Sequence, residues 1–365
     1  MYFAPMVRLQ QLSLVQFRNY IQKQFVFTDR IVGIVGQNGV GKTNVLDAIY
    51  YLSFTKSYFS RPDAQNVHHA YQGLRVEGQY DINSDQISIT CILRETLKKE
   101  FYYDQEAYTK LSQHIGKIPC VMIAPDDVQI ITGSSEERRK LMDSLLSQMH
   151  PDYLRYLIAY NKVLVQRNSL LKHAGETGVL DSILLETINE QLISNGQHIY
   201  EYRKQLIEKY LPKILSLYQN LAGQEDQINI QYQSQLQLQP FNELLHQSLA
   251  KDKVLQRTNV GIHKDDLLIS IQGQPFKQEA SQGQRKSLLF AIRLAEWELI
   301  KENKGFAPIL LMDDIFEKLD EQRMIQLLGW VSHSTDGQVF ITDTHKQRVA
   351  DLLGKHLDSY QLIEL

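Results

Sequence analysis

An eight-residue segment with the spacing Gly-x-x-x-x-Gly-Lys-Thr carries the clearest chemistry in this chain. Glycines at these positions let successive backbone N–H groups turn inward and form a cradle for anions. Lys42 is then placed to reach the β- and γ-phosphates of a nucleotide, and the Thr43 hydroxyl to ligate Mg²⁺. We predict that the whole segment binds a nucleotide and that Lys42 also acts in catalysis. The segment is Gly36, Gln37, Asn38, Gly39, Val40, Gly41, Lys42 and Thr43.

The neighbouring residues predict the elements that such a loop requires. Residues 31–35 form an apolar run typical of a buried central strand, and residues 44–52 follow the pattern of an amphipathic helix. A chance glycine turn, the alternative interpretation, would lack both neighbours. Further strands are predicted at residues 7–20, where apolar and polar residues alternate, and at residues 25–27.

A second group of chemically useful residues follows an apolar run at residues 309–312. The run predicts a buried strand that ends in two carboxylates, Asp313 and Asp314. Asp313 would hold Mg²⁺, and Asp314 would orient or deprotonate the attacking water. Alone this pattern is weak, because many core strands end in solvated acids.

The order of motifs along the chain resembles that of the ATP-binding-cassette (ABC) ATPase superfamily. Ser281-Gln282-Gly283-Gln284 precedes a predicted helix at residues 286–301 and stands in the place of the signature motif. Residues 317–320 stand in the place of the D-loop, before a predicted strand at residues 339–342. This resemblance implies that Ser281 and Gly283 serve the ATP bound by a second subunit. Two heads would then sandwich two ATP molecules, and hydrolysis would let them separate.

Composition sets outer limits on the function. The chain has 365 residues, 43% hydrophobic and 22% charged, as in an ordinary globular protein with two domains or one large insertion. A net charge of −3 argues against a protein coated in positive charge but leaves a local basic DNA-binding face open. Cys91 and Cys120 are too few and too far apart for a disulfide framework or a metal site. Apolar stretches fall far short of the roughly 18–20 residues that span a bilayer. We therefore expect a cytoplasmic protein without a membrane partner.

Additional blocks distinguish between branches of the superfamily. They are Phe17-Arg18-Asn19-Tyr20, Pro125-Asp126-Asp127, Gly133 to Arg139, Leu141-Met142-Asp143 and Thr258 to Leu267. With them, the chain resembles the RecF family of bacterial recombination mediators, relatives of the SMC heads, over essentially its whole length. The middle blocks are the more specific ones, because transport ATPases lack them.

The family resemblance implies an ATP-dependent DNA-binding protein of recombinational repair with ATP and Mg²⁺ as cofactors. It would form a homodimer on ATP, bind duplex DNA at single-strand gaps, and help RecR and RecO to load a RecA-type recombinase. ATP hydrolysis would be slow and would serve to release the complex. Arg18 and Asn19 would contact the nucleotide. The alternatives are the ATPase subunit of a transporter, a P-loop kinase and a purely structural SMC-like protein.

Some positions depart from the family pattern. Ile262 and Lys264 replace the usual proline and arginine of a Gly-Pro-His-Arg-Asp-Asp block, and Glu317-Lys318 replace Ser-Glu in the D-loop. Asp343 stands where the switch histidine of ABC ATPases is expected, and His345 lies two residues further on. A clear Q-loop glutamine is also missing.

The long segment between the phosphate-binding loop and the signature motif predicts an inserted, mostly helical lobe. Apolar residues at spacings of three and four run through 154–171 and 185–206 and are separated by glycines at 175 and 178. This predicts a short antiparallel coiled-coil arm, followed by strands at 228–232 and 236–238 that return to the head. The predicted fold is α/β, with an ABC-type head at 1–130 and 225–365 and the arm lobe at 131–224.

Basic residues along the arm leave two interpretations open. They could contact DNA phosphates, or they could belong to a solvated helix face, since glutamates such as Glu186, Glu190 and Glu201 are interleaved. Residue by residue, the solvated face is favoured. The arginines and lysine at 138–140 are more typical of a structural or nucleotide-linked role. The candidate phosphate contacts are Arg155, Lys162, Arg167, Lys172, Arg203 and Lys204.

Overall fold

The computed structural model describes residues 7–59, 62–82, 84–222, 226–314, 321–333, 336–357 and 359–365. The chain divides into two compact units. The first, which we call the head, comprises Met1–Asp127, Ser216–Gln224 and Gln282–Leu365. The second, which we call the lobe, comprises Val128–Leu215 and Glu225–Ser281. This division differs from the predicted boundaries, because it groups residues 225–281 with the lobe.

A five-stranded, wholly parallel sheet forms the centre of the head, in the order β14-β3-β13-β12-β8. Every residue of β3, β8, β12 and β13 is buried, which explains why these strands are continuous apolar runs. The strands predicted at 31–35, 309–312 and 339–342 are confirmed. Their bounds are β3 Ile31–Val35, β8 Cys120–Ile123, β12 Ile309–Met312, β13 Val339–Asp343 and β14 Gln361–Glu364.

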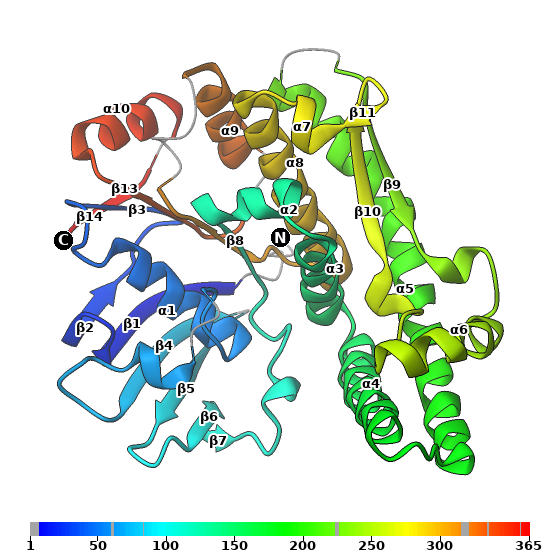
Figure 1. Ribbon diagram of the computed structural model, residues 1–365. Helices are drawn as coiled ribbons and strands as arrows, with labels where there is room; N and C mark the ends of the chain where they lie inside the picture. Colours follow the sequence, from blue (N-terminus) through cyan, green and yellow to red (C-terminus); the bar gives the residue numbers. More distant parts are fainter. Residues whose placement is uncertain are drawn as a thin grey trace. The chain divides into compact units, whose positions relative to one another are not determined.

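A six-stranded antiparallel sheet forms the second layer of the head, in the order β2-β1-β4-β5-β6-β7. Helix α1, Lys42–Phe54, contacts strands of both sheets and lies between them (Figure 1). Side chains from both sheets and α1 form one hydrophobic cluster. The strands are β1 Val7–Phe17, β2 Tyr20–Val26, β4 Leu74–Ile82, β5 Asp85–Leu93, β6 Lys99–Tyr103 and β7 Glu106–Ala107.

The remaining helices of the head follow the signature motif. They are α8 Gln282–Lys304, α9 Glu321–His333 and α10 Lys346–His356, and short 3-10 turns occur at Asp63–Asn66, Leu111–Gln113 and Pro125–Val128. The helix predicted at 286–301 is confirmed and begins four residues earlier. Because β3, β12 and β13 are parallel, their carboxyl ends meet at one edge of the sheet, where ligands of open α/β sheets bind.

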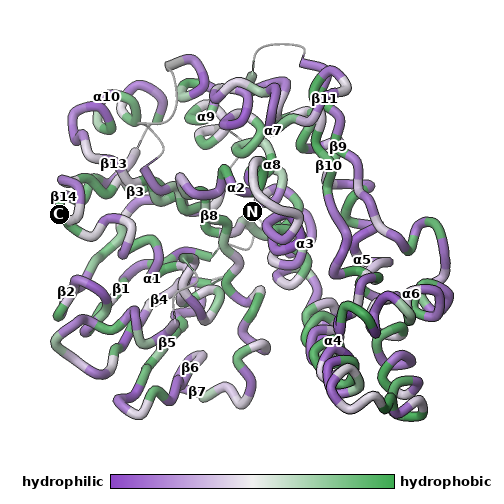
Figure 2. Tube along the Cα trace, in the orientation of Figure 1, coloured by the Kyte–Doolittle hydropathy of each residue, from purple (hydrophilic) through white to green (hydrophobic). Residues whose placement is uncertain are grey.

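The lobe is built on the predicted helical hairpin. α4, Pro151–Thr177, and α5, Ser182–Ala222, run side by side, and the residues of α5 from Ser216 onward belong to the head (Figure 1). α4 ends at Gly178, whose φ of 75° favours glycine. Hydrophobic and hydrophilic residues are interspersed along α4 (Figure 2), and its buried residues recur at helical spacing, as in an amphipathic helix. The other elements are α2 Gln129–Thr132, α3 Ser135–Met149, α6 Phe241–Leu255, α7 Phe276–Glu279, β9 Ile228–Gln233, β10 Asp266–Ile271 and β11 Gln274–Pro275.

The strands that follow the hairpin do not join the sheets of the head. β9 pairs with β10 in a separate three-stranded sheet, β11-β10-β9, within the lobe. The strand predicted at 236–238 is wrong, since Gln235–Gln237 is a 3-10 turn. Ser234 Oγ accepts a hydrogen bond from Leu236 N, and the Gln237 side chain accepts one from Ser234 N, so a capping box ends the strand.

Two sequence expectations concern the chain as a whole. Cys91 and Cys120 are both free and buried. Within the described ranges, none of the helices combines the length and apolarity that crossing a membrane demands.

Candidate nucleotide site

The loop that we predict to bind phosphate connects β3 to the N-terminus of α1. Gly41 caps this helix with a φ of 113°, a conformation that favours glycine. A Cβ at Gly41 would lie 2.6 Å from Asn19 Nδ2 and 2.7 Å from the Tyr20 hydroxyl. The Lys42 ammonium donates to the carbonyl oxygens of Gly36, at 2.8 Å, and Gln37, at 3.0 Å. The loop therefore holds the lysine against its own backbone, at the positive end of the helix dipole.

A two-residue turn between β1 and β2 supports this loop. Phe17 pairs with Tyr20, so Arg18 and Asn19 form the turn, and Arg18 has the positive φ of 52° that tight hairpins require. Asn19 Nδ2 donates to the Val40 carbonyl at 2.9 Å.

Asn44 in the first turn of α1 joins the two turn residues. Asn44 Nδ2 donates to Asn19 Oδ1 at 2.8 Å, and Arg18 Nη1 donates to Asn44 Oδ1 at 2.9 Å. Arg18 also forms an ion pair with Asp47, which is fully buried. The turn therefore fixes the loop and the first turns of α1 in place.

The acidic end of β12 lies beside the threonine of the loop. Thr43 Oγ1 is 3.0 Å from both carboxylate oxygens of Asp313, and Thr342 Oγ1 donates to Asp313 Oδ1 at 2.7 Å. Burial raises the pKa of the Asp313 carboxyl above its ordinary value, although both hydroxyl donors act in the opposite direction. Hydroxyl and carboxylate oxygens are ligands that Mg²⁺ accepts, so this pair fits the expected cation.

Asp314 adopts an unusual backbone conformation next to this pair. Its φ of 48° is rare for a residue other than glycine, and its N–H donates to Thr342 Oγ1 at 2.9 Å. One threonine hydroxyl thus bonds to Asp313 and to the backbone of Asp314, fixing how the two carboxylates leave the strand. Backbone strain of this kind concentrates at functional sites.

The loop and the acidic pair line one hollow of about 310 Å³. Arg18 and Asn19 lie outside the lining: Asn19 contacts the loop at Val40, and Arg18 contacts Asn44 in the first turn of α1. Gly36, Gln37 and Val40 belong to the loop but not to the lining. The lining residues are Asn38, Gly39, Gly41, Lys42, Thr43, Asn44, Pro125, Asp313 and Asp314.

The signature motif, Ser281 to Gln284, lies at the start of α8. Ser281 ends the lobe unit and immediately precedes α8. A Cβ at Gly283 would lie 3.0 Å from the Arg323 guanidinium, and Arg323 Nε donates to Ser287 Oγ at 2.8 Å. The D-loop positions 317–320 lie outside the described residues.

Asp343, in the position of the switch histidine, forms contacts with two residues at the start of α10. It is fully buried, its Oδ1 accepts from His345 N at 2.7 Å, and Arg348 Nη2 lies 2.6 Å from its Oδ2. These bonds fix the start of α10, so the geometry favours a structural role for this carboxylate.

The site includes residues that the sequence prediction did not assign to it. Thr342 was noted only as part of a strand, and Pro125 only as part of a family block. Asp127 of the same block accepts from Ala124 N at 2.9 Å and lies 3.0 Å from Arg293 of α8. The block therefore shapes a wall of the hollow and connects it to the signature helix. The sequence did carry a signal for Thr342. Its hydroxyl lies near the end of a predicted strand, as Asp313 follows the end of another, and such strand ends can meet at one edge of a sheet.

Two of the candidate DNA contacts on the arm are buried in ion pairs. Arg203 lies 2.7 Å from Asp265 and 2.8 Å from Asp143, and it is 1% exposed. Arg167 is fully buried and lies 2.7 Å from Asp252. Neither guanidinium can reach a phosphate, so a contact with DNA is excluded for both. The sequence could not reveal this because their acidic partners are far away in the chain.

The family blocks of the lobe meet in the same network. Arg138 Nε lies 2.6 Å from Asp266, and Arg139 Nη1 donates to the Asp265 carbonyl at 2.7 Å. These contacts join the block at 133–139 to the block at 258–267. The arginines at 138 and 139 are therefore structural, as their position in the sequence favoured.

The sequence of this chain is similar to those of known proteins. The model of the RecF/RecN/SMC N-terminal domain matches residues 8–359. The DNA replication and repair protein RecF of Flavobacterium johnsoniae is 41% identical over 359 residues, covering 98% of this chain and 100% of that protein. The protein of the same name from Parabacteroides distasonis is 39% identical and covers 94% of this chain and 93% of its own length.

Solved structures agree with this likeness. A structure of the recombination mediator RecF with ATP, from the RecFOR pathway, aligns with a TM-score of 0.87 and 27% identity over 94% of both chains. A structure of RecF with ATPγS aligns with a TM-score of 0.88 and 26% identity, over 100% of this chain and 98% of that one. The Smc head of Pyrococcus furiosus aligns at 0.56 with 16% identity, which supports a common fold.

Proposed function

The chain belongs to the RecF family of DNA replication and repair proteins, and from that premise we propose that it is an ATP-gated DNA-binding protein of recombinational repair. ATP brings two heads together, the dimer holds duplex DNA at single-strand gaps, and slow hydrolysis releases it. With RecR and RecO it helps to load a RecA-type recombinase. We expect it to act in the cytoplasm, because its proposed partner is DNA. The observation that carries the proposal is the junction of Thr43, Asp313 and Thr342 beside the phosphate-binding loop.

The residues of the candidate nucleotide site have distinct roles in this proposal. The backbone of residues 36–41 and the Lys42 ammonium bind the phosphates, because N–H groups and a cation converge there. Thr43 and Asp313 hold Mg²⁺, which neutralises phosphate charge when bound. The strained Asp314 orients or deprotonates the attacking water. Its backbone bond to Thr342 keeps it next to the metal-binding carboxylate.

The signature residues act between subunits in this proposal. Ser281 and the N-terminus of α8 bind the γ-phosphate held by the other head, and Gly283 allows close approach. Removal of the γ-phosphate then weakens the contact between the heads, since ATP is shared by both. ATP hydrolysis would therefore act as a conformational switch between joined and separated heads, and it need not be fast. Arg18 and Asn19 act by positioning the loop.

The family membership decides between the alternatives left open by the sequence. Matches to RecF proteins extend over 98% of the chain and include the lobe. A transporter subunit or a kinase would match over the head alone. A purely structural SMC-like protein would have much longer arms than helices of 27 and 41 residues.

The test is light scattering of the purified chain with and without ATP–Mg²⁺, with binding to gapped duplex DNA measured in the same samples. We expect monomers to become dimers and the affinity for DNA to rise in step. An unchanged oligomeric state together with an unchanged DNA affinity would refute the proposed switch. EDTA in place of Mg²⁺ is the matched control.

A further inference from the structure

The end of α6 and the loop that follows it, up to β10, carry positive charge that no described residue neutralises in an ion pair. In the segment from Lys251 to Asp266, all three acidic residues form ion pairs with arginines of the helices. Asp252 pairs with Arg167, Asp265 with Arg203 and Asp266 with Arg138. The basic residues of the same segment are Lys251, Lys253, Arg257 and Lys264. All four are exposed, and none forms an ion pair with a residue that the structure describes.

Two of these cations lie close to each other and to a third. The positive charges of Arg257 and Arg139 contribute to lowering the pKa of Lys264, after burial as the largest cause. The Arg139 guanidinium contacts the Asp265 carbonyl, next to Lys264 in the chain. Like charges held close together repel each other. The Asp252 carboxylate acts in the opposite direction on the pKa of Lys264, and a bound anion would relieve the repulsion further.

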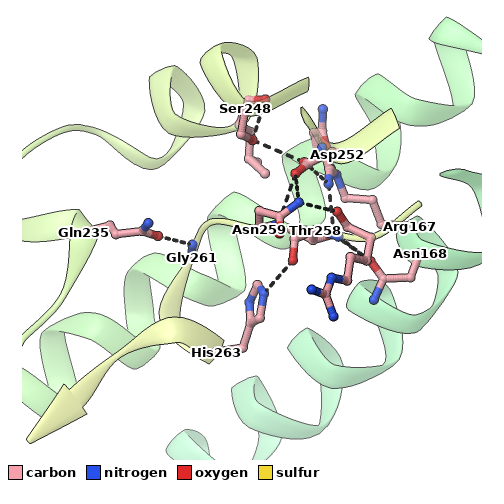
Figure 3. A network of polar contacts seen from close by, with 12 residues as sticks. Arg167, Asn168, Gln235, Ser248, Asp252, Thr258, Asn259, Gly261 and His263 are labelled. Carbon is pink, nitrogen blue, oxygen red and sulfur yellow. Dashed lines mark hydrogen bonds and ion pairs between the residues drawn. The ribbon is translucent and has the colours of Figure 1, made fainter. Parts of the chain in front are cut away.

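A buried network holds the loop that carries the cations in a fixed shape (Figure 3). Asp252 Oδ1 accepts from Asn259 N and Nδ2, both at 3.0 Å. Asn168 Oδ1 of α4 accepts from Thr258 N and Oγ1, both at 2.8 Å.

Further bonds pin the second half of the same loop. Gln235 Oε1 accepts from Gly261 N at 3.0 Å, and His263 Nδ1 lies 2.8 Å from the Tyr160 hydroxyl. Because these bonds already fix the loop, binding a ligand does not carry the entropic cost of ordering a flexible loop.

We infer that the segment Lys251–Lys264, with Arg257 and Lys264 at its centre, is a binding site for the phosphate backbone of duplex DNA. The inference rests on the proposed function, which supplies a polyanion as the partner. Exposed, uncompensated lysines and arginines suit phosphate contacts that position DNA without reading its sequence. The arm arginines Arg167 and Arg203 contribute indirectly, by neutralising the acidic residues of the loop.

The test compares two double variants of this 365-residue chain in the presence of ATP–Mg²⁺. R257Q/K264Q removes the two central cations, and R94Q/K140Q removes two exposed cations that are already paired with acidic neighbours and are not candidate DNA contacts. Affinity for duplex DNA is measured between 50 and 200 mM salt. We expect R257Q/K264Q to weaken binding about tenfold and to reduce the salt slope by about 2, and the control to change neither.

Three further measurements keep the outcomes separate. R257K/K264R should restore affinity and slope, and ATP-dependent dimerisation of R257Q/K264Q should be unchanged. In the wild-type chain, duplex DNA should protect Lys264 from acetylation but leave Lys140 reactive, which tests the site without any variant. If R257Q/K264Q dimerises and binds DNA as the wild type does, the inference is wrong and the proposed function stands. If the wild-type chain binds no duplex DNA with ATP, both fall.

Discussion

Thr43 Oγ1 lies 3.0 Å from both carboxylate oxygens of Asp313, although the two residues are 270 positions apart. The parallel pairing of β3, β13 and β12 makes this possible, because it brings the start of α1 and the end of β12 to the same edge of one sheet. The hydroxyl and the carboxylate are the two protein ligands that we assign to Mg²⁺. Their contact therefore links the glycine-rich loop to the residue next to Asp314, which we propose orients the attacking water.

Removing the hydroxyl of this pair should uncouple nucleotide binding from magnesium. We expect T43A to bind ATP at least tenfold more weakly in Mg²⁺ and to lose the difference between Mg²⁺ and EDTA, because one metal ligand is gone. T43S, which keeps the hydroxyl, is the control. Titration with a fluorescent ATP analogue measures both. A T43A variant that keeps the full magnesium dependence would contradict the assignment.

Ser281 and Lys42 should separate dimerisation from nucleotide binding. S281R places a large side chain where the second subunit's γ-phosphate is proposed to bind, so we expect normal ATP binding without ATP-dependent dimers. K42M should lose both properties, because it removes a phosphate contact within the same head. Light scattering and nucleotide titration on both variants measure the two properties. An S281R variant that still dimerises with ATP would overturn the shared-site model.

Gly41 should tolerate no side chain. An added Cβ would come within 2.8 Å of three atoms of Asn19 and Tyr20, and the φ of 113° is strained for alanine. We expect G41A to lower the free energy of unfolding by about 1–3 kcal/mol and to weaken ATP binding. G39A is the matched control, since nothing lies within 4 Å of its Cβ and only the φ of 84° costs energy. Thermal unfolding of both variants measures the difference; equal losses would count against the clash.

The buried ion pair between Arg167 and Asp252 should be a major determinant of lobe stability. Both side chains are fully buried, so R167M leaves a carboxylate without its cation and should cost about 3–5 kcal/mol. R155Q breaks an exposed pair with Asp152 and should cost less than about 1 kcal/mol. Urea unfolding of the two variants provides the comparison. A loss below 1 kcal/mol in R167M would show that the pair is dispensable.

A buried histidine in the head and a half-buried histidine in the lobe should make both units sensitive to acid. Burial lowers the pKa of His114 in the head and of His263 in the lobe to about 4, from an ordinary 6.5. His114 Nε2 lies 2.6 Å from the Leu52 carbonyl, and His263 Nε2 lies 3.2 Å from the Thr258 carbonyl. Each nitrogen donates to its carbonyl in the neutral ring.

Below pH 6.5 the unfolded chain therefore binds protons that the folded chain does not. We expect the free energy of unfolding to fall as the pH is lowered from 6.5 to 4, by about 1.4 kcal/mol per pH unit for each histidine. H114Q and H263Q should each flatten this dependence in urea unfolding at several pH values. An unchanged slope in both variants would refute the assignment.

The sequence alone determined the parts of the fold that depend on local pattern. The strands at 31–35, 309–312 and 339–342 were predictable because strands buried on both faces are apolar throughout. The arm was predictable because its apolar residues recur at helical spacing between glycines. The position of the glycine-rich loop between β3 and α1 was predictable because its residue types and spacing require a strand before it and a helix after it.

Only the tertiary structure decided which distant residues meet. It placed Thr342 between Asp313 and Asp314, buried Arg167 and Arg203 in ion pairs, and grouped residues 225–281 with the lobe. A charged residue has the same identity on a solvated face and in a buried pair. Its role is set by the distance to partners up to hundreds of positions away, which chain folding decides and local pattern does not carry.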